Sequence, residues 1–315
     1  MSTPPSSNFQ KIIRSSQNES FTFSIIIPSY NNLAFLKKCI ESIRKNSTHT
    51  NQIIIAVNEG SDGTTEWINT NENIDAVIFT QNVGVCLAMN AARSLVQSNY
   101  IVYANDDMYM LPEWDNVFLQ EINNIGHNSF YLSGTMIEPI DTGNPCVVVA
   151  DFGNSLETFQ EENLLNNLTQ LKRNDWQGAT WPPSVMHRDI WDLIGGFGIE
   201  FSPGMYSDPD ISMKLWLIGV RIFKGCGNSL VYHFGSKTTK RIKVNNGALL
   251  FFLKWGISSS TFTKKIIQRG YPFTSELNSR PVLKENFVKS FQKKLTALIK
   301  YNGVESNSFW NRFKS

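Results

Sequence analysis

The stretch Phe23-Ser-Ile-Ile-Ile-Pro28-Ser-Tyr-Asn31 decides the fold of this chain. Its β-branched run ends at a proline, which is typical of a strand buried on both faces. After a short loop, apolar side chains recur at helical spacing, at Leu36, Cys39, Ile40 and Ile43. A buried strand followed by an amphipathic helix is the repeating unit of an α/β fold.

The same alternation continues along the chain. The sequence predicts strands at Gln52–Val57, Ala76–Thr80 and Tyr100–Ala104, with a helix at Gly84–Val96. This order predicts a Rossmann-like, mainly parallel central sheet flanked by helices. Ligands bind at the carboxyl ends of the strands in such sheets. Polar side chains follow the predicted strands at Asn58, Glu59, Asn105, Asp106 and Asp107.

The rest of the chain predicts three segments. Residues 1–20 are polar and are expected to form a flexible tail. Residues 21–237 are expected to form a single catalytic domain. Beyond residue 237 the composition turns basic and helical, so 238–315 is expected to be a helical extension. Further strands are predicted within the domain at Phe130–Ile137, Cys146–Asp151, Val220–Lys224 and Leu230–Phe234.

Bulk composition excludes several classes of protein. The formal net charge is +2, which is too small for nucleic-acid binding by bulk electrostatics. The four cysteines contain no C-x-x-C pair, so neither a zinc site nor a redox motif is expected. No apolar run is long enough for a secretory signal or a bilayer span, so we expect a cytoplasmic protein, soluble or peripheral at a membrane.

Asn105-Asp106-Asp107 is a candidate metal site because it directly follows a buried strand. Oxygen ligands at a strand end suit Mg²⁺ or Mn²⁺, which can also bind phosphates. Such an ion would stabilise a departing nucleotide diphosphate as a Lewis acid. The alternative is a solvated turn, because Asn and Asp are common in turns.

Asp208 and His233 each have two interpretations. Asp208 followed by Pro209 predicts a helix start, with Asp208 as N-cap; a helix N-terminus would also keep the carboxylate ionised, as a general base requires. Asp210 is the neighbouring candidate for that role. His233, at the end of an apolar run, is either a core histidine or a metal or phosphate ligand. Asn82-Val83-Gly84 opens a helix, where a glycine lets the backbone approach a ligand.

Together these segments resemble the nucleotide-sugar glycosyltransferases of family 2, which have the GT-A fold. Ser24–Asn31 is similar to the family's opening strand and loop, and Val57–Thr64 to its V-D-D-G-S segment, with Asn58 and Glu59 replacing the acids. Asn105-Asp106-Asp107 lies where the D-x-D motif belongs. The remaining similar blocks begin at Asn82, Gly195, Ser207 and Tyr232.

The resemblance implies a role for each block. It makes Asp208 the catalytic base, with Ser207 in place of the usual glutamate, and Asp107 and His233 the ligands of Mn²⁺ or Mg²⁺. Asn105 replaces the first acid, as in the rhamnosyltransferase-like branch. It places the nucleotide-diphosphate sugar donor against Pro28, Ser29, Tyr30, Glu59, Asn82, Gly84, Asn105 and Asp106.

The acceptor side is predicted from aromatic residues. Trp176, Trp181 and Tyr206 lie near the blocks that face the acceptor in relatives, and aromatic rings stack on sugars. Core packing is the alternative. The resemblance implies an inverting transfer to a saccharide or lipid-linked saccharide, in surface glycan or polysaccharide synthesis.

Two other functional classes remain open on the sequence. A nucleotidylyltransferase would need a Gly-rich, basic loop after the first strand, and Ser29–Asn32 contains neither Gly nor Lys. A non-catalytic sugar-nucleotide or glycan-binding module would tolerate the substitutions at Asn58, Asn105 and Ser207. The basic segment Lys237–Ser315 could contact an anionic membrane, or form a solvated appendage or a dimer contact.

Overall fold

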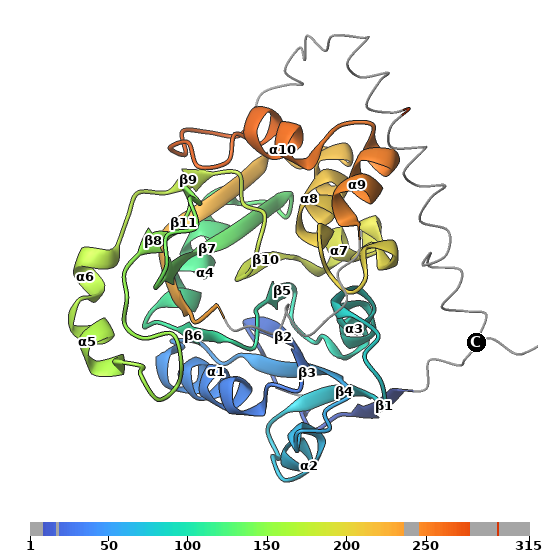
Figure 1. Cartoon of the computed structure of the whole chain (residues 1–315), viewed down its shortest axis with the longest axis vertical. Helices are drawn as coiled ribbons and strands as arrows, with labels where there is room; N and C mark the ends of the chain where they lie inside the picture. Colours follow the sequence, from blue (N-terminus) through green and yellow to red (C-terminus); the bar gives the residue numbers. More distant parts are fainter. Residues whose placement is uncertain (1–8, 17–18, 236–245, 278–294, 296–315) are drawn as a thin grey trace, which may run out of the picture.

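The computed structural model describes residues 9–16, 19–235, 246–277 and Leu295, which include one mixed β-sheet and its covering helices (Figure 1). The strands are β1 Phe9–Ile12, β2 Phe23–Tyr30, β3 Gln52–Asn58, β4 Asp75–Phe79, β5 Tyr100–Tyr103, β6 Met108–Met110, β7 Phe130–Glu138, β8 Val148–Val149, β9 Trp176–Gln177, β10 Ser184–His187 and β11 Ile222–His233.

The α-helices are α1 Leu33–Asn46, α2 Thr64–Asn69, α3 Val85–Ala92, α4 Trp114–Ile125, α5 Glu161–Asn166, α6 Leu168–Leu171, α7 Arg188–Ile194, α8 Ser207–Leu217, α9 Gly247–Trp255 and α10 Ser259–Thr261. Short 3-10 turns are η1 Arg93–Leu95 and η2 Ile199–Phe201, and η4 Phe262–Ile266 is a π-helical turn.

The strands run in the order β1-β4-β3-β2-β5-β10-β7-β11-β6. The α/β fold is as predicted, and the predicted parallel pairing holds for β4, β3, β2 and β5 and again for β7 and β11. Antiparallel β10 lies between these two groups and joins them. The carboxyl ends of β2, β3 and β5 therefore meet at one edge, where the polar loops were expected.

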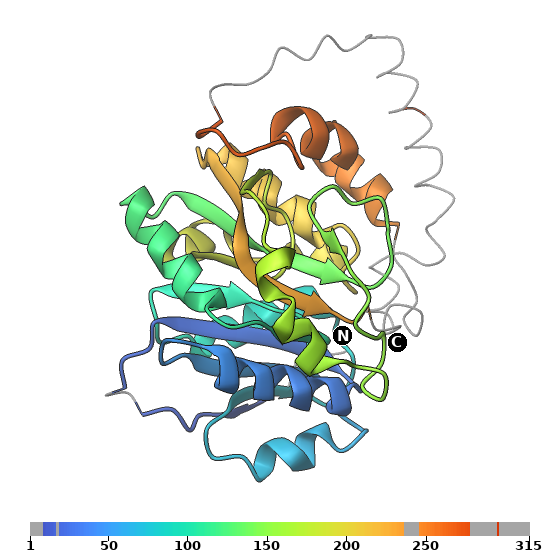
Figure 2. The same ribbon diagram turned by 90° about the vertical axis from the view of Figure 1, so that its left-hand side faces the viewer.

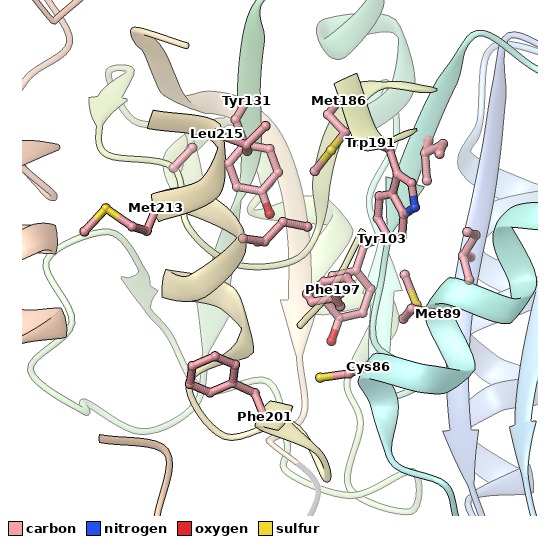
Figure 3. Packing of buried hydrophobic residues seen from close by; sticks show 14 of the residues in the cluster. Cys86, Met89, Tyr103, Tyr131, Met186, Trp191, Phe197, Phe201, Met213 and Leu215 are labelled. Carbon is pink, nitrogen blue, oxygen red and sulfur yellow. The ribbon is translucent and has the colours of Figure 1, made fainter. Parts of the chain in front are cut away.

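Both faces of the sheet are covered because its strands are apolar on both sides. Ile25 and Ile27 of β2 pack with α1 and α4 on one face, while Ile26 packs on the opposite face. That opposite face is covered by α3, α7 and α8, and Figure 3 shows Met89 of α3 and Leu215 of α8 within its core. Figure 2 shows the resulting layers from the side.

The sheet extends beyond the predicted domain start, which corrects part of the expected flexible tail. Phe9–Ile12 form β1, antiparallel to β4 at the sheet edge. The backbone N–H of Arg14 also donates to Asp75 Oδ1 at 2.6 Å. No sequence pattern indicated this strand, because edge strands are short and half exposed and their apolar signal is weak.

Two predicted strands are one in the structure. Val220–Lys224 and Leu230–Phe234 were expected separately, but β11 runs from Ile222 to His233 with a register shift between Cys226 and Leu230. The glycines and polar residues between the two apolar runs form this irregularity, which the sequence pattern alone presents as a break.

The segment 246–277 packs onto the domain that precedes it. Phe251 of α9, Phe262 of η4 and Ile267 belong to the same buried cluster as α3 and α8. In Figure 1 these helices, coloured orange, lie beside α8. The first part of the predicted basic extension thus contributes to the core, whereas the lysine-rich stretch 283–300 lies, apart from Leu295, outside the described residues.

Two further findings concern cysteines and membrane spans. All four cysteines are buried free thiols. Among the described residues, no helix has the length and apolar character needed to cross a bilayer.

Candidate active site

Asp106 joins the ends of β2 and β5. The Ser29 hydroxyl donates to Asp106 Oδ2 at 2.8 Å, and the Asn32 side-chain amide donates to Oδ1 at 3.0 Å. The predicted donor residues Ser29 and Asp106 are therefore brought together as expected from the sheet order. Because both Asp106 oxygens accept hydrogen bonds from the protein, Asp106 is better placed to shape the loop than to bind a ligand.

Asp107 faces His233 across the end of the sheet. His233 Nε2 lies 3.5 Å from Asp107 Oδ1, and its Nδ1 lies 2.9 Å from Glu138 Oε1. Burial disfavours the charged imidazole, but the two carboxylates, Asp107 foremost, raise the pKa of His233 to about 10. The structure thus unites the two predicted metal ligands and adds Glu138, which the sequence analysis missed. The sequence feature that could have identified Glu138 is its position at the carboxyl end of β7.

The residues around Asp107 fit a divalent cation that takes its other ligands from a diphosphate. None of the described residues forms a cluster of three or more His, Cys, Asp or Glu side chains able to hold a metal. Asp107 and His233 nevertheless lie together, and a cation bound there would displace the proton that the raised pKa keeps on His233. Mg²⁺ commonly uses one or two carboxylates plus substrate phosphates. Glu138 at Nδ1 would orient the imidazole, as carboxylates behind ligating histidines do.

The loop after β3 places Glu59 beside the loop after β2. Glu59 has a left-handed backbone (φ 69°), and its carboxylate accepts a hydrogen bond from Ser61 at 3.1 Å and one from Asn31 at 3.4 Å. Asn58 is turned inward, where its side-chain oxygen accepts from the Val83 N–H at 3.1 Å. Asn58 and Glu59 replace the two acids of the family's V-D-D-G-S segment. Glu59 thus contacts the loop after β2, while Asn58 holds the loop before α3 in place.

Gly84 serves packing in this structure. A Cβ at Gly84 would lie 2.9 Å from the Pro203 Cα, and the Val85 N–H donates to the Pro203 carbonyl at 3.0 Å. Asn82 accepts from the Gly84 N–H at 2.9 Å and so shapes the turn. The predicted close backbone approach is real, but the approaching group is the loop that precedes α8.

The start of α8 corrects the predicted cap. Tyr206, with φ 69°, precedes the helix, and Ser207 is its first residue, so Asp208 lies inside the first turn rather than at the N-cap. The Asp-Pro pair still marks the helix start to within two residues. The left-handed backbone at Tyr206 sets the direction of α8. No sequence rule for an Asp-Pro pair predicts this backbone conformation.

The ionisation of Asp208 also differs from the prediction. Burial raises the pKa of Asp208 to about 7, so the helix N-terminus does not keep it ionised at acid pH. A carboxylate with such a pKa is a good general base near neutrality. Tyr103 at the end of β5 feels the charges of both Asp208 and Asp107, and these, after burial, raise its pKa. The predicted base and the predicted metal ligand therefore both act electrostatically on the side chain at this strand end.

Asp208 lines a pocket of about 310 Å³. Trp181 and Tyr206, the predicted acceptor residues, line it too. A second wall comes from the segment after α9 and was not foreseen in the sequence, because this segment lies far from Trp181 in the chain. The residues of that wall are Ser259, Ser260, Thr263, Lys264 and Arg269.

Trp176 does not share this position. Its side chain is 1% exposed, and its indole N–H donates to the Thr135 hydroxyl at 2.9 Å. It lies on β9, which pairs with β11, so its ring packs in the interior. The packing alternative therefore accounts for Trp176, and we do not include it among the acceptor residues.

Asp210, the alternative base, is held by α9. It is fully buried, and its Oδ1 accepts from Lys254 Nζ and from Trp255 Nε1, each at 2.8 Å. Lys254 also contacts Glu200 at 2.7 Å. Burial raises the pKa of Asp210, while Lys254 opposes the shift. Asp210 is thus a structural carboxylate that fixes α8, and with it Asp208, against α9.

Replacing Lys254 with methionine is expected to lower the free energy of unfolding by about 2 kcal/mol, because it leaves the buried Asp210 without its cation. Urea denaturation measures this change. Lys45→Met is the matched control: Lys45 pairs with Glu161 but is half exposed, so the cost should stay below about 1 kcal/mol. Equal costs for the two variants would contradict a positioning role for Lys254.

Comparisons with known proteins agree with this geometry. Residues 24–177, slightly less than half of the chain, match the family model described as Glycosyl transferase family 2. A crystal structure of S. aureus TarS 1–349 is similar at a TM-score of 0.51 and 15% identity, over 68% of this chain and 60% of that one. GalNAc-T7 with UDP, GalNAc and Mn²⁺ gives 0.51 and 13%, over 79% and 48%.

These likenesses show that the chain has the GT-A fold, as the sequence predicted. The chain spans 60% or less of the length of these two structures. No curated protein matches it. The rhamnosyltransferase-like branch stays a prediction.

Proposed function

We propose that this protein is a metal-dependent, inverting glycosyltransferase that transfers a sugar from a nucleotide-diphosphate donor to an acceptor hydroxyl. One observation supports the proposal: Asp208, whose pKa burial raises to about 7, lines a pocket, and both Asp208 and Asp107 act on Tyr103 at the end of β5. A titrating base beside a candidate diphosphate site is what sugar transfer requires.

The donor side is supported by the loops at the carboxyl ends of β2, β3 and β5. Asp107 and His233 would hold Mn²⁺ or Mg²⁺, with help from Asn105, which lies two residues before Asp107 in the chain. Bound there, the ion would act as a Lewis acid on the diphosphate as it leaves. GalNAc-T7, which shares the fold, was solved with UDP and Mn²⁺, and this supports a uridine nucleotide and that ion as first candidates.

The acceptor side is supported by the pocket. Asp208 takes the proton of an acceptor hydroxyl that enters beside Trp181 and Tyr206. The oxygen attacks the anomeric carbon on the face opposite the nucleotide, the carbon–oxygen bond to the diphosphate breaks, and its electron pair leaves with the diphosphate. The anomeric configuration therefore inverts. We place the reaction in the assembly of a surface glycan or polysaccharide, on a saccharide or lipid-linked saccharide.

A thermal-shift panel tests the donor proposal. UDP, GDP, dTDP and CDP are each added with Mn²⁺ or with EDTA. A nucleotide at 100 times its Kd stabilises the folded protein by about 2.7 kcal/mol, which raises the melting midpoint by a few degrees. We expect one nucleotide, UDP first, to do so in Mn²⁺ and to lose the effect in EDTA. No shift with any nucleotide would contradict the proposal and favour a glycan-binding module.

A further inference from the structure

The pocket beside Asp208 has one cationic wall. Arg269 and Lys264 line it together with Asp208 of α8. Neither forms an ion pair with any carboxylate in the described part of the chain. By contrast Lys254, nearby on α9, is paired with two carboxylates. Two unpaired cations in a pocket are a ready site for an anion.

Arg269 is held in place by its surroundings. Its guanidinium carbon lies 4.6 Å from the centre of the Trp181 ring, and its backbone N–H donates to the Thr263 carbonyl at 2.8 Å. A Cβ at Gly178 would lie 2.5 Å from the Arg269 Cα, so the two backbones are in direct contact. A half-buried arginine fixed in this way loses little conformational freedom on binding an oxyanion.

The pocket holds the proposed base and both cations. Asp208, Lys264 and Arg269 all line it. An acceptor that reaches all three must present its hydroxyl to Asp208 and its negative charge to the two cations. A neutral saccharide would leave both cations without a counter-charge, and an anion placed at Asp208 would be repelled once that carboxyl is ionised.

We infer that the acceptor is an anionic saccharide, whose phosphate or carboxylate binds to Arg269 and Lys264 while its hydroxyl lies at Asp208. This rests on the proposed function of the pocket and names its substrate class. The serine hydroxyls of α10, Ser259 and Ser260, line the same wall and can donate to the anion. Trp181 then supports both the sugar ring and the arginine that binds the charge.

Binding of small probes to the full chain tests this inference without a sugar donor. Glucose 6-phosphate, glucuronate and glucose are titrated by ligand-observed NMR. Hydrogen bonds to a charged group should make at least one anion bind about tenfold tighter than glucose. The double variant Lys264→Gln/Arg269→Gln should lose that preference. Lys265→Gln, an exposed neighbour outside the pocket lining, should keep it.

Two results would overturn the inference. If neither anion bound more tightly than glucose, the acceptor would not be anionic. If the double variant kept the preference for an anion, the anion would bind at a site other than Arg269 and Lys264. The nucleotide panel separates this failure from that of the proposed function. A UDP shift present in all variants without an anion preference refutes only the acceptor class, whereas the absence of any nucleotide shift refutes the donor proposal.

Discussion

Asp208→Asn is expected to lower turnover by a factor of about 100 or more while the affinity for the donor stays nearly unchanged. The amide has the shape of the carboxylate but cannot accept the proton of an acceptor hydroxyl. We expect nucleotide binding to depend on the loops at the ends of β2, β3 and β5 and on the metal, so the loss should fall on turnover. Initial rates over a range of donor concentrations separate the two quantities.

The pH dependence gives a second readout of the same residue. Because the pKa of Asp208 is about 7, the wild-type rate should rise about tenfold per pH unit below neutrality and level off above it. The residual rate of Asp208→Asn should lack this step. Asp189→Asn, which changes an exposed carboxylate on α7, should keep both the rate and the step. If Asp208→Asn kept the wild-type pH profile, Asp208 would not be the general base.

Stability should change in the opposite direction to activity. The pKa of Asp208 in the folded protein is raised from its ordinary value of 3.8 to about 7, so the folded protein loses stability as pH rises from 3.8 to about 7, and the loss is complete at higher pH. Asparagine carries no charge at any pH. Asp208→Asn should therefore melt at a higher temperature than wild type at pH 8, with little difference at pH 4. A lower midpoint at pH 8 would contradict the burial of this carboxylate.

Asp107→Ala is expected to remove the metal dependence of donor binding and to lower kcat/KM by about 100-fold or more, because the cation would stabilise the departing diphosphate by several kcal/mol. It also takes away the foremost carboxylate beside His233, so the pKa of that histidine should fall. Titration of UDP with and without Mn²⁺, followed by calorimetry, measures the first effect.

The wild-type protein in EDTA is the control for Asp107→Ala. Both should bind UDP with the same weak affinity, and Mn²⁺ should restore tight binding to the wild type alone. An alanine variant that still gains affinity from Mn²⁺ would exclude Asp107 as a ligand. His233→Ala tests the second proposed ligand in the same assay.

The strands at the centre of the sheet were predictable because they are buried on both faces. Three apolar runs are stable only between two layers of helices: Phe23–Pro28, Gln52–Val57 and Tyr100–Ala104. Their order then places Asp107 at the strand ends. The edge strand β1 was not predicted. It pairs with one neighbouring strand and is half exposed, so its position places few constraints on its sequence.

The sequence by itself determined the α/β order, the strand-end position of Asp107 and the nearness of Asp208 to a helix start, since these follow from local pattern and chain order. Only the tertiary structure decided that Trp181 faces the pocket while Trp176 is buried, that Glu138 backs His233, that Asp208 has a pKa of about 7 and that Arg269 closes the pocket. The physical reason is that burial and charge at a site depend on groups distant in the chain, which no local pattern specifies.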